Sequence, residues 1–347
     1  MKHLILTGAC YVDTILNVPY FPGEDEKLRA TTAQVRRGGN CPNSIEVLLQ
    51  LLSRHPQGEG NNTQNGGAGI KTHLISVLPA RDSPATAMIA ESFGPSLGHE
   101  SHIGNLDFCL YRSGHTTPAS SYVIRSAATG SRTIVNHYGL PEMEAVEFKA
   151  TTKRFFDSHQ TAPADSSVWH FEGRAPGTTL ACIKHLQSQC GSGKDIAISV
   201  EVEKPGRAGL RELAALANIV FFSKTWAENE GYASAEDCLR GEGASLPQAA
   251  LLFCTWGAQV AAAFSPRTKG SILHYPAPDV PAESIVDAVG AGDTFVAGVL
   301  YQLATNKATQ EQNGDWTVDD DTIVDILSFA VNLASKKIKI DGFQGLV

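Results

Sequence analysis

The feature that most constrains the fold is a regular alternation of apolar, β-branched runs with helical patterns. Such runs occupy residues 3–10, 72–79, 166–172, 196–202, 219–223 and 251–256. When a helix separates two strands, it returns the chain to the same end of the sheet, so the strands pair in parallel. The pattern therefore predicts an α/β fold with a central, mostly parallel sheet flanked by helices.

Helical periodicity fills most of the intervals between these runs. The clearest case covers residues 42–54, where apolar residues recur at three- and four-residue spacing and Asn40 stands ahead of them as a candidate cap. Apolar residues on one helical face must pack against another element, which agrees with helices that cover a sheet. Further helices are predicted at residues 86–93, 178–189, 210–217, 235–240, 295–304 and 322–337.

One stretch departs from the alternation. Residues 121–126 and 132–137 are two strand-like runs joined by a short segment that contains Gly130, which predicts a β-hairpin. With the extended N-terminal region, the hairpin is expected to form a small separate sheet, of the kind that serves as a lid in α/β enzymes. The predicted lid covers about residues 10–35 and 111–137.

Two polar segments, residues 55–71 and 306–315, predict surface insertions, because neither can bury enough apolar surface to order itself. The remaining pattern is continuous from one end of the chain to the other. Residues 1–347 are therefore expected to form a single domain with these two insertions and the lid.

Charge and cysteine content narrow the functional classes. The net charge of −8 disfavours nucleic acids and anionic membranes as partners, since both require a basic surface. The seven cysteines are an odd number without a CxxC pair, which indicates reduced thiols and a cytoplasmic location. The apolar run Leu4 to Leu6 is too short for a signal core or a membrane span.

The most specific motif is Asp-Ala-Val-Gly-Ala-Gly-Asp-Thr-Phe at residues 287–295, between a strand-like run and an apolar helix. A turn of small residues at a helix start presents backbone N–H groups at the positive end of the helix dipole, which suits a phosphoryl oxygen. Asp293 would then lie beside the anion. On spacing alone, a simple helix cap explains the pattern equally well.

A second polar cluster begins the 42–54 helix. Gly39, Asn40 and Asn43 combine close backbone approach with amide groups that can hydrogen-bond a polyhydroxylated ligand. Asp13, after the first strand, is a further candidate. A cap and turn would also account for these residues. Other nucleotide signatures are missing, since the sequence contains neither a G-x-x-x-x-G-K-[ST] string nor a G-x-G-x-x-G string after the first strand.

Taken together, these residues resemble the PfkB (ribokinase-like) carbohydrate kinases, and within that family most closely the ketohexokinase subgroup. The resemblance covers nearly the whole chain apart from the two insertions. Its carriers are the Gly-Gly-Asn-Cys-Pro-Asn-Ser run at 38–44, Ser-Arg-Thr-Ile-Val at 131–135, His-Phe-Glu-Gly-Arg at 170–174, Ser-Val-Glu-Val-Glu-Lys-Pro at 199–205, residues 290–295 and Gly-Phe-Gln-Gly at 342–345.

The resemblance implies an ATP-dependent sugar kinase, with fructose as the favoured substrate. Alternatives are a PfkB kinase of another sugar or of a nucleoside, and a catalytically silent PfkB-fold protein that binds a sugar. By resemblance, Asp293 is the catalytic base, and the backbone of Gly290, Ala291 and Gly292 forms the anion hole. The sugar-binding positions are Asp13, Gly39, Asn40 and Asn43.

The same resemblance assigns the nucleotide, cation and subunit contacts. Arg132 would contact ATP phosphate, while Trp256, Gly257 and Val331 would line the adenosine site. Mg²⁺ is expected with ATP, and Asp287 with the 338–345 loop would bind a monovalent cation such as K⁺. The resemblance also implies a homodimer through the lids, in which Asp25 reaches the partner's sugar.

One departure from the family concerns the metal. Ribokinases carry an N-x-x-E motif where this chain has Ser-Lys-Thr-Trp at residues 223–226. The glutamate associated with Mg²⁺ in those relatives is therefore missing at this position.

Overall fold

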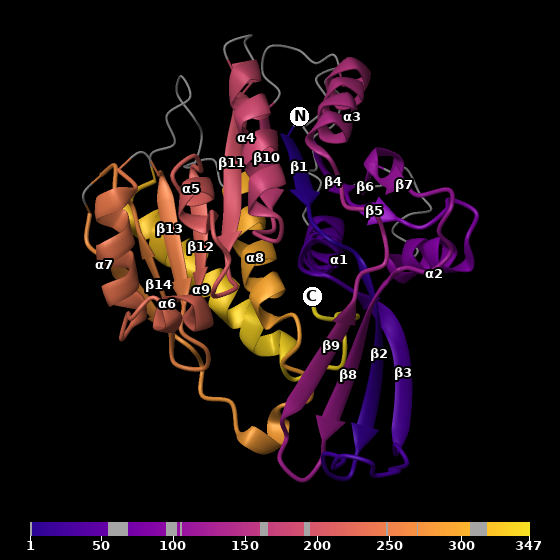
Figure 1. The fold of residues 1–347 in the computed structure, drawn as a ribbon. Coiled ribbons are helices and arrows are strands. Elements are labelled where there is room, and N and C mark those ends of the chain that lie inside the picture. Colours follow the sequence, from indigo (N-terminus) through magenta and orange to yellow (C-terminus); the bar gives the residue numbers. More distant parts are fainter. Residues whose placement is uncertain are drawn as a thin grey trace.

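All six apolar runs contribute strands to one sheet in the computed structural model of the chain (Figure 1). The structure describes residues 2–54, 69–94, 103–104, 106–159, 166–190, 195–247, 249–268, 270–305 and 318–347.

Within these residues the large sheet has nine strands. They are β1 (Lys2–Thr7), β4 (Ile70–Ile75), β6 (Ile103–Gly104), β10 (Ser166–Phe171), β11 (Asp195–Val202), β12 (Ile219–Ser223), β13 (Leu251–Thr255), β14 (Val260–Phe264) and β15 (Leu273–Pro276). Their order is β15-β14-β13-β12-β11-β10-β1-β4-β6. The pairs β13–β14 and β14–β15 are antiparallel, and the other pairs are parallel. The predicted mostly parallel sheet is confirmed.

Helices cover both faces of this sheet. On one face the core includes side chains of α1 (Asn40–Ser53), α2 (Pro84–Ser92), α8 (Ala291–Thr305) and α9 (Asp320–Lys337). On the other face it includes side chains of α3 (Ala145–Ser158), α4 (Pro176–Cys190), α5 (Leu210–Ala214), α6 (Lys224–Asn229) and α7 (Ala235–Ser245). Short 3-10 turns occupy Leu106–Phe108 and Ala282–Ser284.

Alternate residues of each central strand supply the two cores. In β13, Leu251 and Phe253 face one helical layer, while Leu252 and Cys254 face the other. Strands buried on both faces are apolar at nearly every position, because successive side chains point to opposite faces. This explains why the sequence shows continuous apolar runs here instead of an alternating pattern.

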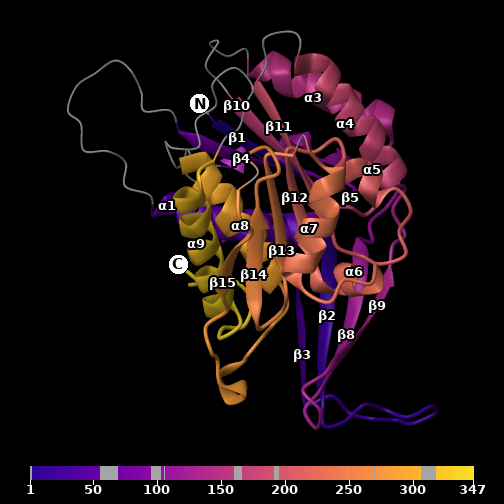
Figure 2. The same ribbon diagram turned by 90° about the vertical axis from the view of Figure 1, so that its left-hand side faces the viewer.

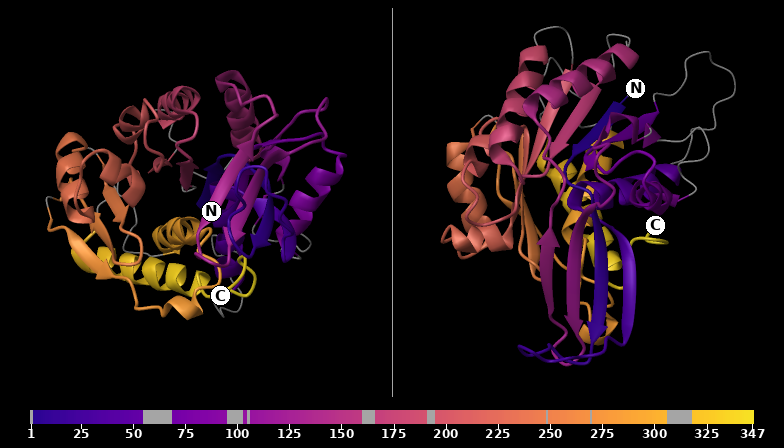
Figure 3. Two further views of the ribbon diagram at one scale, coloured as in Figure 1. Left: turned by 60° about the horizontal axis from the view of Figure 1, so that its bottom comes forward. Right: turned by 45° about the vertical axis from the view of Figure 1, so that its right-hand side comes forward.

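The lid is a four-stranded sheet that extends beyond one end of the large sheet (Figure 2 and Figure 3). It contains β2 (Tyr11–Val18), β3 (Thr32–Gly38), β8 (Ala119–Ser126) and β9 (Arg132–His137), in the order β3-β2-β8-β9. Strands β8 and β9 pair in antiparallel fashion, which confirms the hairpin. The predicted lid boundary at residue 111 is wrong, because β7 (Leu110–Tyr111) pairs with β5 (Val77–Leu78).

The two predicted insertions fall largely outside the described residues, which omit 55–68 and 306–317. The 55–71 boundary needs one correction, because Ile70 and Lys71 already belong to β4. Among the described helices, none combines the length and the apolar character required to cross a bilayer. All seven cysteines lie in described residues, and none forms a disulfide.

Helix α3 offers a direct test of the packing on one face of the sheet. Phe148 is fully buried against Trp169 and Phe171, whereas Val146 on the same helix is 65% exposed. We expect Phe148→Ala to lower the free energy of unfolding by about 3–5 kcal/mol, because it leaves a cavity in the core. Val146→Ala should change it by less than about 0.5 kcal/mol. Urea denaturation of both variants measures the difference, and equal stabilities would contradict the assigned packing.

Candidate active site

A cavity of about 390 Å³ lies between the inner face of the lid and the carboxyl ends of the central strands. In parallel α/β sheets the carboxyl ends of the strands are the usual position of a binding site. Most of the predicted site residues line the cavity: Asp13, Gly39, Asn40, Asn43, Arg132, Gly290, Ala291, Gly292 and Asp293. The fold thus brings together residues from opposite ends of the sequence.

The start of α1 supplies the two asparagines. Gly39 precedes the helix with a positive φ of 107°, and a Cβ at this position would lie 2.2 Å from the carbonyl oxygen of Ala9. Only glycine allows this approach of two backbone segments. Asn40 and Asn43 are three positions apart, so both point from the first helical turn toward the cavity.

The start of α8 supplies Asp293 and the small-residue turn. Gly290 has a φ of 82°, and an added Cβ would lie 2.2 Å from Cζ of Phe343. The aromatic ring therefore packs directly on the turn. The first backbone N–H groups of a helix have no partner within the helix, so this turn presents donors to the cavity.

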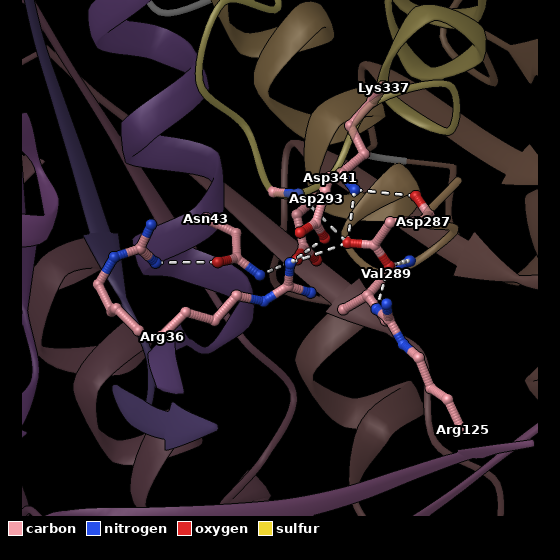
Figure 4. Close-up of polar contacts among 10 residues, drawn as sticks. Arg36, Asn43, Arg125, Asp287, Val289, Asp293, Lys337 and Asp341 are labelled. Carbon is pink, nitrogen blue, oxygen red and sulfur yellow. Dashed lines mark hydrogen bonds and ion pairs between the residues drawn. The ribbon is translucent and has the colours of Figure 1, made fainter. Parts of the chain in front are cut away.

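A hydrogen bond joins the two helix starts (Figure 4). Asn43 Nδ2 donates to Asp293 Oδ2 at 2.7 Å, and Arg37 Nη1 donates to Asn43 Oδ1 at 2.9 Å. The arginine thus fixes which end of the amide faces the carboxylate. Ser44 Oγ also donates to the backbone oxygen of Asp293 at 2.9 Å. Asp293 is held in one orientation by contacts from α1.

Three glutamates in the cavity lining were not predicted as site residues: Glu172, Glu201 and Glu203. Asn40 Nδ2 donates to Glu201 Oε2 at 2.7 Å and to Glu203 Oε2 at 2.9 Å. The signal in the sequence was a charged residue inside an apolar run, because Glu201 is the only charged residue of residues 196–202. A buried carboxylate in such a strand needs a specific partner or function.

Burial and mutual repulsion shift the pKa values of these carboxyl groups. Burial, followed by the charges of Glu201 and other carboxylates, raises the pKa of Glu172 to about 7. Burial and Glu203 also raise the pKa of Glu201. Burial and Glu201 raise the pKa of Asp293 well above its usual value, although the hydrogen bond from Asn43 opposes the shift. Such perturbed acidic groups in a cavity are typical of functional sites.

Cationic side chains balance this acidic cluster. Arg132, Arg174, Lys204 and Arg207 all line the cavity. Arg174 bonds to Glu142 and stacks over Tyr138, and Lys204 pairs with Glu203. Arg132 lies at the first position of β9, and among the described residues no carboxylate forms an ion pair with it. Its charge is available to an anionic ligand.

Other predicted residues lie away from the cavity lining. Asp25 has a φ of 62° and lies in the exposed loop between β2 and β3. This loop joins the two strands at the far end of the lid (Figure 2). Trp256 and Gly257 directly follow Thr255, which does line the cavity. Val331 is buried in the core beside α8. The roles assigned to these residues stay predictions.

Asp287 does not fit the predicted monovalent cation site. Three cationic side chains already contact its carboxylate: Arg36 at 2.9 Å, Arg125 at 2.5 Å and Lys337 at 3.1 Å. Burial alone would raise the pKa of this carboxyl group, but Arg36 and Lys337 outweigh it and hold the pKa at about 2. A further cation beside Asp287 would be repelled by all three partners.

The structure also brings three histidines together, His3, His73 and His159, which their spacing along the chain does not predict. Their ring nitrogens lie within 4.8 Å of one another, and His3 Nδ1 is 3.0 Å from His73 Nε2. Phe155 packs edge-on against His3 and His73. Burial lowers the pKa of His73 to about 2, so this ring is neutral. The cluster is not part of the cavity lining.

Comparison with known proteins shows which family the chain belongs to. The model of the pfkB family carbohydrate kinases matches residues 100–344. Ketohexokinase of Mus musculus is 28% identical over 352 residues, which cover 100% of this chain and 99% of that protein.

Solved structures show the same fold. The ribokinase of Giardia lamblia superimposes with a TM-score of 0.73 at 13% identity, covering 100% of this chain and 97% of that one. The Arabidopsis thaliana ribokinase complexed with ribose and ATP superimposes with a TM-score of 0.64 at 17% identity. The match covers 98% of this chain and 93% of that one. With a ribokinase-like fold and a family match over most of its length, the chain belongs to the pfkB family of carbohydrate kinases.

Proposed function

We propose that this chain is an ATP-dependent kinase that transfers the γ-phosphoryl group of MgATP to a hydroxyl of a small sugar, with fructose as the favoured substrate. One observation carries the proposal. Asp293 lies in the first turn of α8, bonded to Asn43, and shares one cavity with the small-residue turn and with Arg132. A base, an anion site and a phosphate partner are the groups that phosphoryl transfer requires.

The sugar side of the cavity is polar. Asp13, Asn40, Asn43, Ser121 and Asn136 all line it, and each can hydrogen-bond a hydroxyl group. Burial raises the pKa of Asp13, and a hydrogen bond with Ser121 opposes this rise. A dense set of carboxylate and amide groups favours a polyhydroxylated substrate. The similarity to mouse ketohexokinase over the full length supports fructose.

Asp293 would accept the proton of the attacking hydroxyl. The hydroxyl oxygen forms a bond to the γ-phosphorus, the bond from the γ-phosphorus to the bridging oxygen breaks, and ADP leaves with that electron pair. A carboxylate with a raised pKa is a stronger base than an ordinary aspartate. Asn43 donates to the ionised form, so it also orients the oxygen that accepts the proton.

The anionic phosphates would meet two groups. Backbone N–H groups of Gly290, Ala291 and Gly292 at the start of α8 stabilise the transferred group as its charge redistributes. Arg132 faces the same cavity from the lid and supplies a full positive charge. The Arabidopsis ribokinase solved with ribose and ATP supports ATP as the donor.

Mg²⁺ is expected with ATP, and two glutamates fit it, Glu201 at the end of β11 and Glu203 directly after this strand. Glu201 and Glu203 share the amide of Asn40, and oxygen ligands of this kind are those that Mg²⁺ prefers. When bound, Mg²⁺ would neutralise phosphate charge and the repulsion within the acidic cluster. These two residues would take the role that the missing N-x-x-E glutamate has in ribokinases.

Trp256, Gly257 and Val331 remain our proposed adenosine contacts. Thr255 at the end of β13 lines the cavity immediately before Trp256, which supports a nucleotide at this edge of the sheet. Lys224 lies over the Trp256 ring, with its Nζ 5.7 Å from the ring centroid. Trp256 is buried and Gly257 after it is exposed, so a base would meet this turn at Gly257.

A homodimer through the lids also remains a proposal. The outer face of the lid carries a row of exposed apolar side chains: Val35 (58% exposed), Tyr122 (50%) and Val135 (58%). Thr14 completes the row, because it pairs with Val35 on one side and Tyr122 on the other, and Tyr122 pairs with Val135. An exposed apolar row on a small sheet is suited to contact with a second copy. Asp25 at the end of the lid would then reach the partner's cavity.

A panel of sugars and nucleosides tests the proposed function against its alternatives. With MgATP present, release of ADP is measured for fructose, other ketoses and aldoses, and nucleosides. Fructose should give the largest kcat/KM. A larger value for another sugar or a nucleoside would reassign the substrate, and no ADP release with any acceptor would favour a silent binding protein.

The first prediction concerns the base. Asp293→Asn keeps the size of the side chain but cannot accept the hydroxyl proton, so turnover should fall by about two to four orders of magnitude. Calorimetry should still detect MgATP and sugar binding, since the backbone anion site is unchanged. Turnover within a few-fold of wild type, with both ligands bound normally, would reduce Asp293 to a helix cap.

The second prediction concerns stability against pH. The folded-state pKa of Asp293 is raised, so the stability that its protonated form gives is lost as pH rises through that pKa. Asp293→Asn should therefore gain stability over wild type, and the gain should be larger at pH 8 than at pH 5. Urea unfolding at both pH values measures it, with the exposed Asp325→Asn as the charge control. A gain independent of pH would contradict the assigned pKa shift.

The third prediction concerns phosphate charge. Arg132→Ala should raise the KM for ATP roughly ten- to hundredfold and slow turnover, because a charge-assisted contact contributes about 1.5–3 kcal/mol. Sugar binding without nucleotide should stay within about twofold. The exposed Arg240→Ala on α7 is the matched control. An unchanged dependence on ATP would show that Arg132 does not contact phosphate.

A further inference from the structure

Asp287 is the meeting point of three cations from separate elements (Figure 4). Arg36 comes from β3, Arg125 from β8 and Lys337 from the end of α9. The Asp287 side chain is fully buried, and Val289 N also donates to its Oδ1 at 3.0 Å. The residue immediately precedes the turn of small residues that we assign to phosphate binding.

Lys337 differs from the two arginines in what it contacts. Its Nζ donates both to the backbone oxygen of Asp287 at 2.9 Å and to its Oδ2 at 3.1 Å. The side chain is fully buried, and Nζ lies 5.1 Å from the ring centroid of Phe343. A carbonyl oxygen and a carboxylate oxygen of one residue, beside an aromatic face, form a site for a single positive charge.

We propose that the Lys337 ammonium group is a built-in cation that takes the place of the monovalent cation expected at Asp287. An ammonium group is close in size to K⁺ and binds the same oxygen atoms. The inference rests on the proposed kinase function, because it assigns Lys337 a positioning role for the phosphate-binding turn.

The contacts of Lys337 explain how it would affect phosphoryl transfer. Lys337 fixes the carbonyl of Asp287, which leads directly into the turn of residues 288–292. Phe343 packs on Gly290 from the other side, so the ammonium group, the ring and the turn form one packed unit. Movement of the Asp287 carbonyl would redirect the N–H groups that follow it.

Electrostatics disfavours a free cation in addition to Lys337. The carboxylate of Asp287 carries one negative charge and is contacted by three positive side chains. Asp341 pairs with one of them, Arg36, at 3.3 Å. A further positive charge at this carboxylate would be repelled by the three cations that already contact it. The chain should therefore not require a monovalent cation.

The test uses the full-length protein and the variants Lys337→Met and Lys336→Met. Methionine keeps the apolar stem of Lys337 and removes the charge, and Lys336 is the exposed neighbour on the same helix. Phosphoryl transfer is measured with tetramethylammonium as the only monovalent cation, and again after addition of K⁺ or NH₄⁺. Thermal unfolding is measured in the same buffers.

Wild type and Lys336→Met should change less than twofold in kcat on addition of K⁺. Lys337→Met should lose at least tenfold in kcat with little change in the KM for sugar, and NH₄⁺ or K⁺ should restore part of the loss. The same cations should raise the melting temperature of Lys337→Met but not that of wild type.

A wild-type kcat that rises tenfold or more with K⁺ would overturn the proposal. So would a Lys337→Met variant that keeps full activity in tetramethylammonium, or one whose activity and melting temperature no cation restores. If Lys337→Met does not fold, the change in wild-type kcat on addition of K⁺ still decides whether the proposal holds. If wild type phosphorylates no acceptor, the proposed kinase function fails, while the melting temperatures of the two lysine variants still test the built-in cation.

Discussion

The site depends on one hydrogen bond between two helix starts, from Asn43 on α1 to Asp293 on α8. These residues are 250 positions apart, yet both lie in the first turn of their helices at the same edge of the sheet. The two helices cover the same face of the sheet, so their packing sets the distance between the amide and the carboxylate. Arg37 then sets the orientation of the amide. Anything that shifts α1 against α8 would displace the proposed base.

Charge is distributed unevenly around this hydrogen bond. On one side, burial raises the pKa values of Glu172, Glu201 and Asp293, and the charge of Glu201 raises those of Glu172 and Asp293 further. On the other, Asp287 lies among three cations that hold its pKa at about 2. The acidic side is suited to binding a divalent cation and to supplying a base. On the cationic side, ion pairs of Asp287 connect the small-residue turn to the lid strands β3 and β8. Two aspartates six residues apart thus have opposite environments and different roles.

Local sequence signals were sufficient for most of the parallel strands of the large sheet, the lid hairpin and the helix-start residues. Apolar runs identify strands that are buried on both faces. Glycine beside asparagine or aspartate indicates a helix start, and this signal depends only on neighbouring residues. Helix α3 was missed because Phe148 and Phe155 are separated by mostly polar residues. Strand β14 was missed because three of its five residues are alanines, which have little strand preference of their own.

Contacts between distant residues could not be predicted from such signals. Glu172 and Glu201 meet because β10 and β11 pair in one register, and nothing local fixes that register. Lys337 reaches Asp287 across 50 residues only because α9 ends beside the turn. The resemblance to a family assigned Asp287 to a cation, but the identity of that cation required the structure.

The most direct test of the central claim is identification of the product. Phosphorus NMR would follow a reaction of the protein with MgATP and fructose at millimolar concentration. Our account predicts one sugar monophosphate formed for each ADP, with inorganic phosphate near the level of a control without sugar. ADP accompanied by an equal amount of inorganic phosphate, and no sugar phosphate with fructose or any other acceptor, would contradict it.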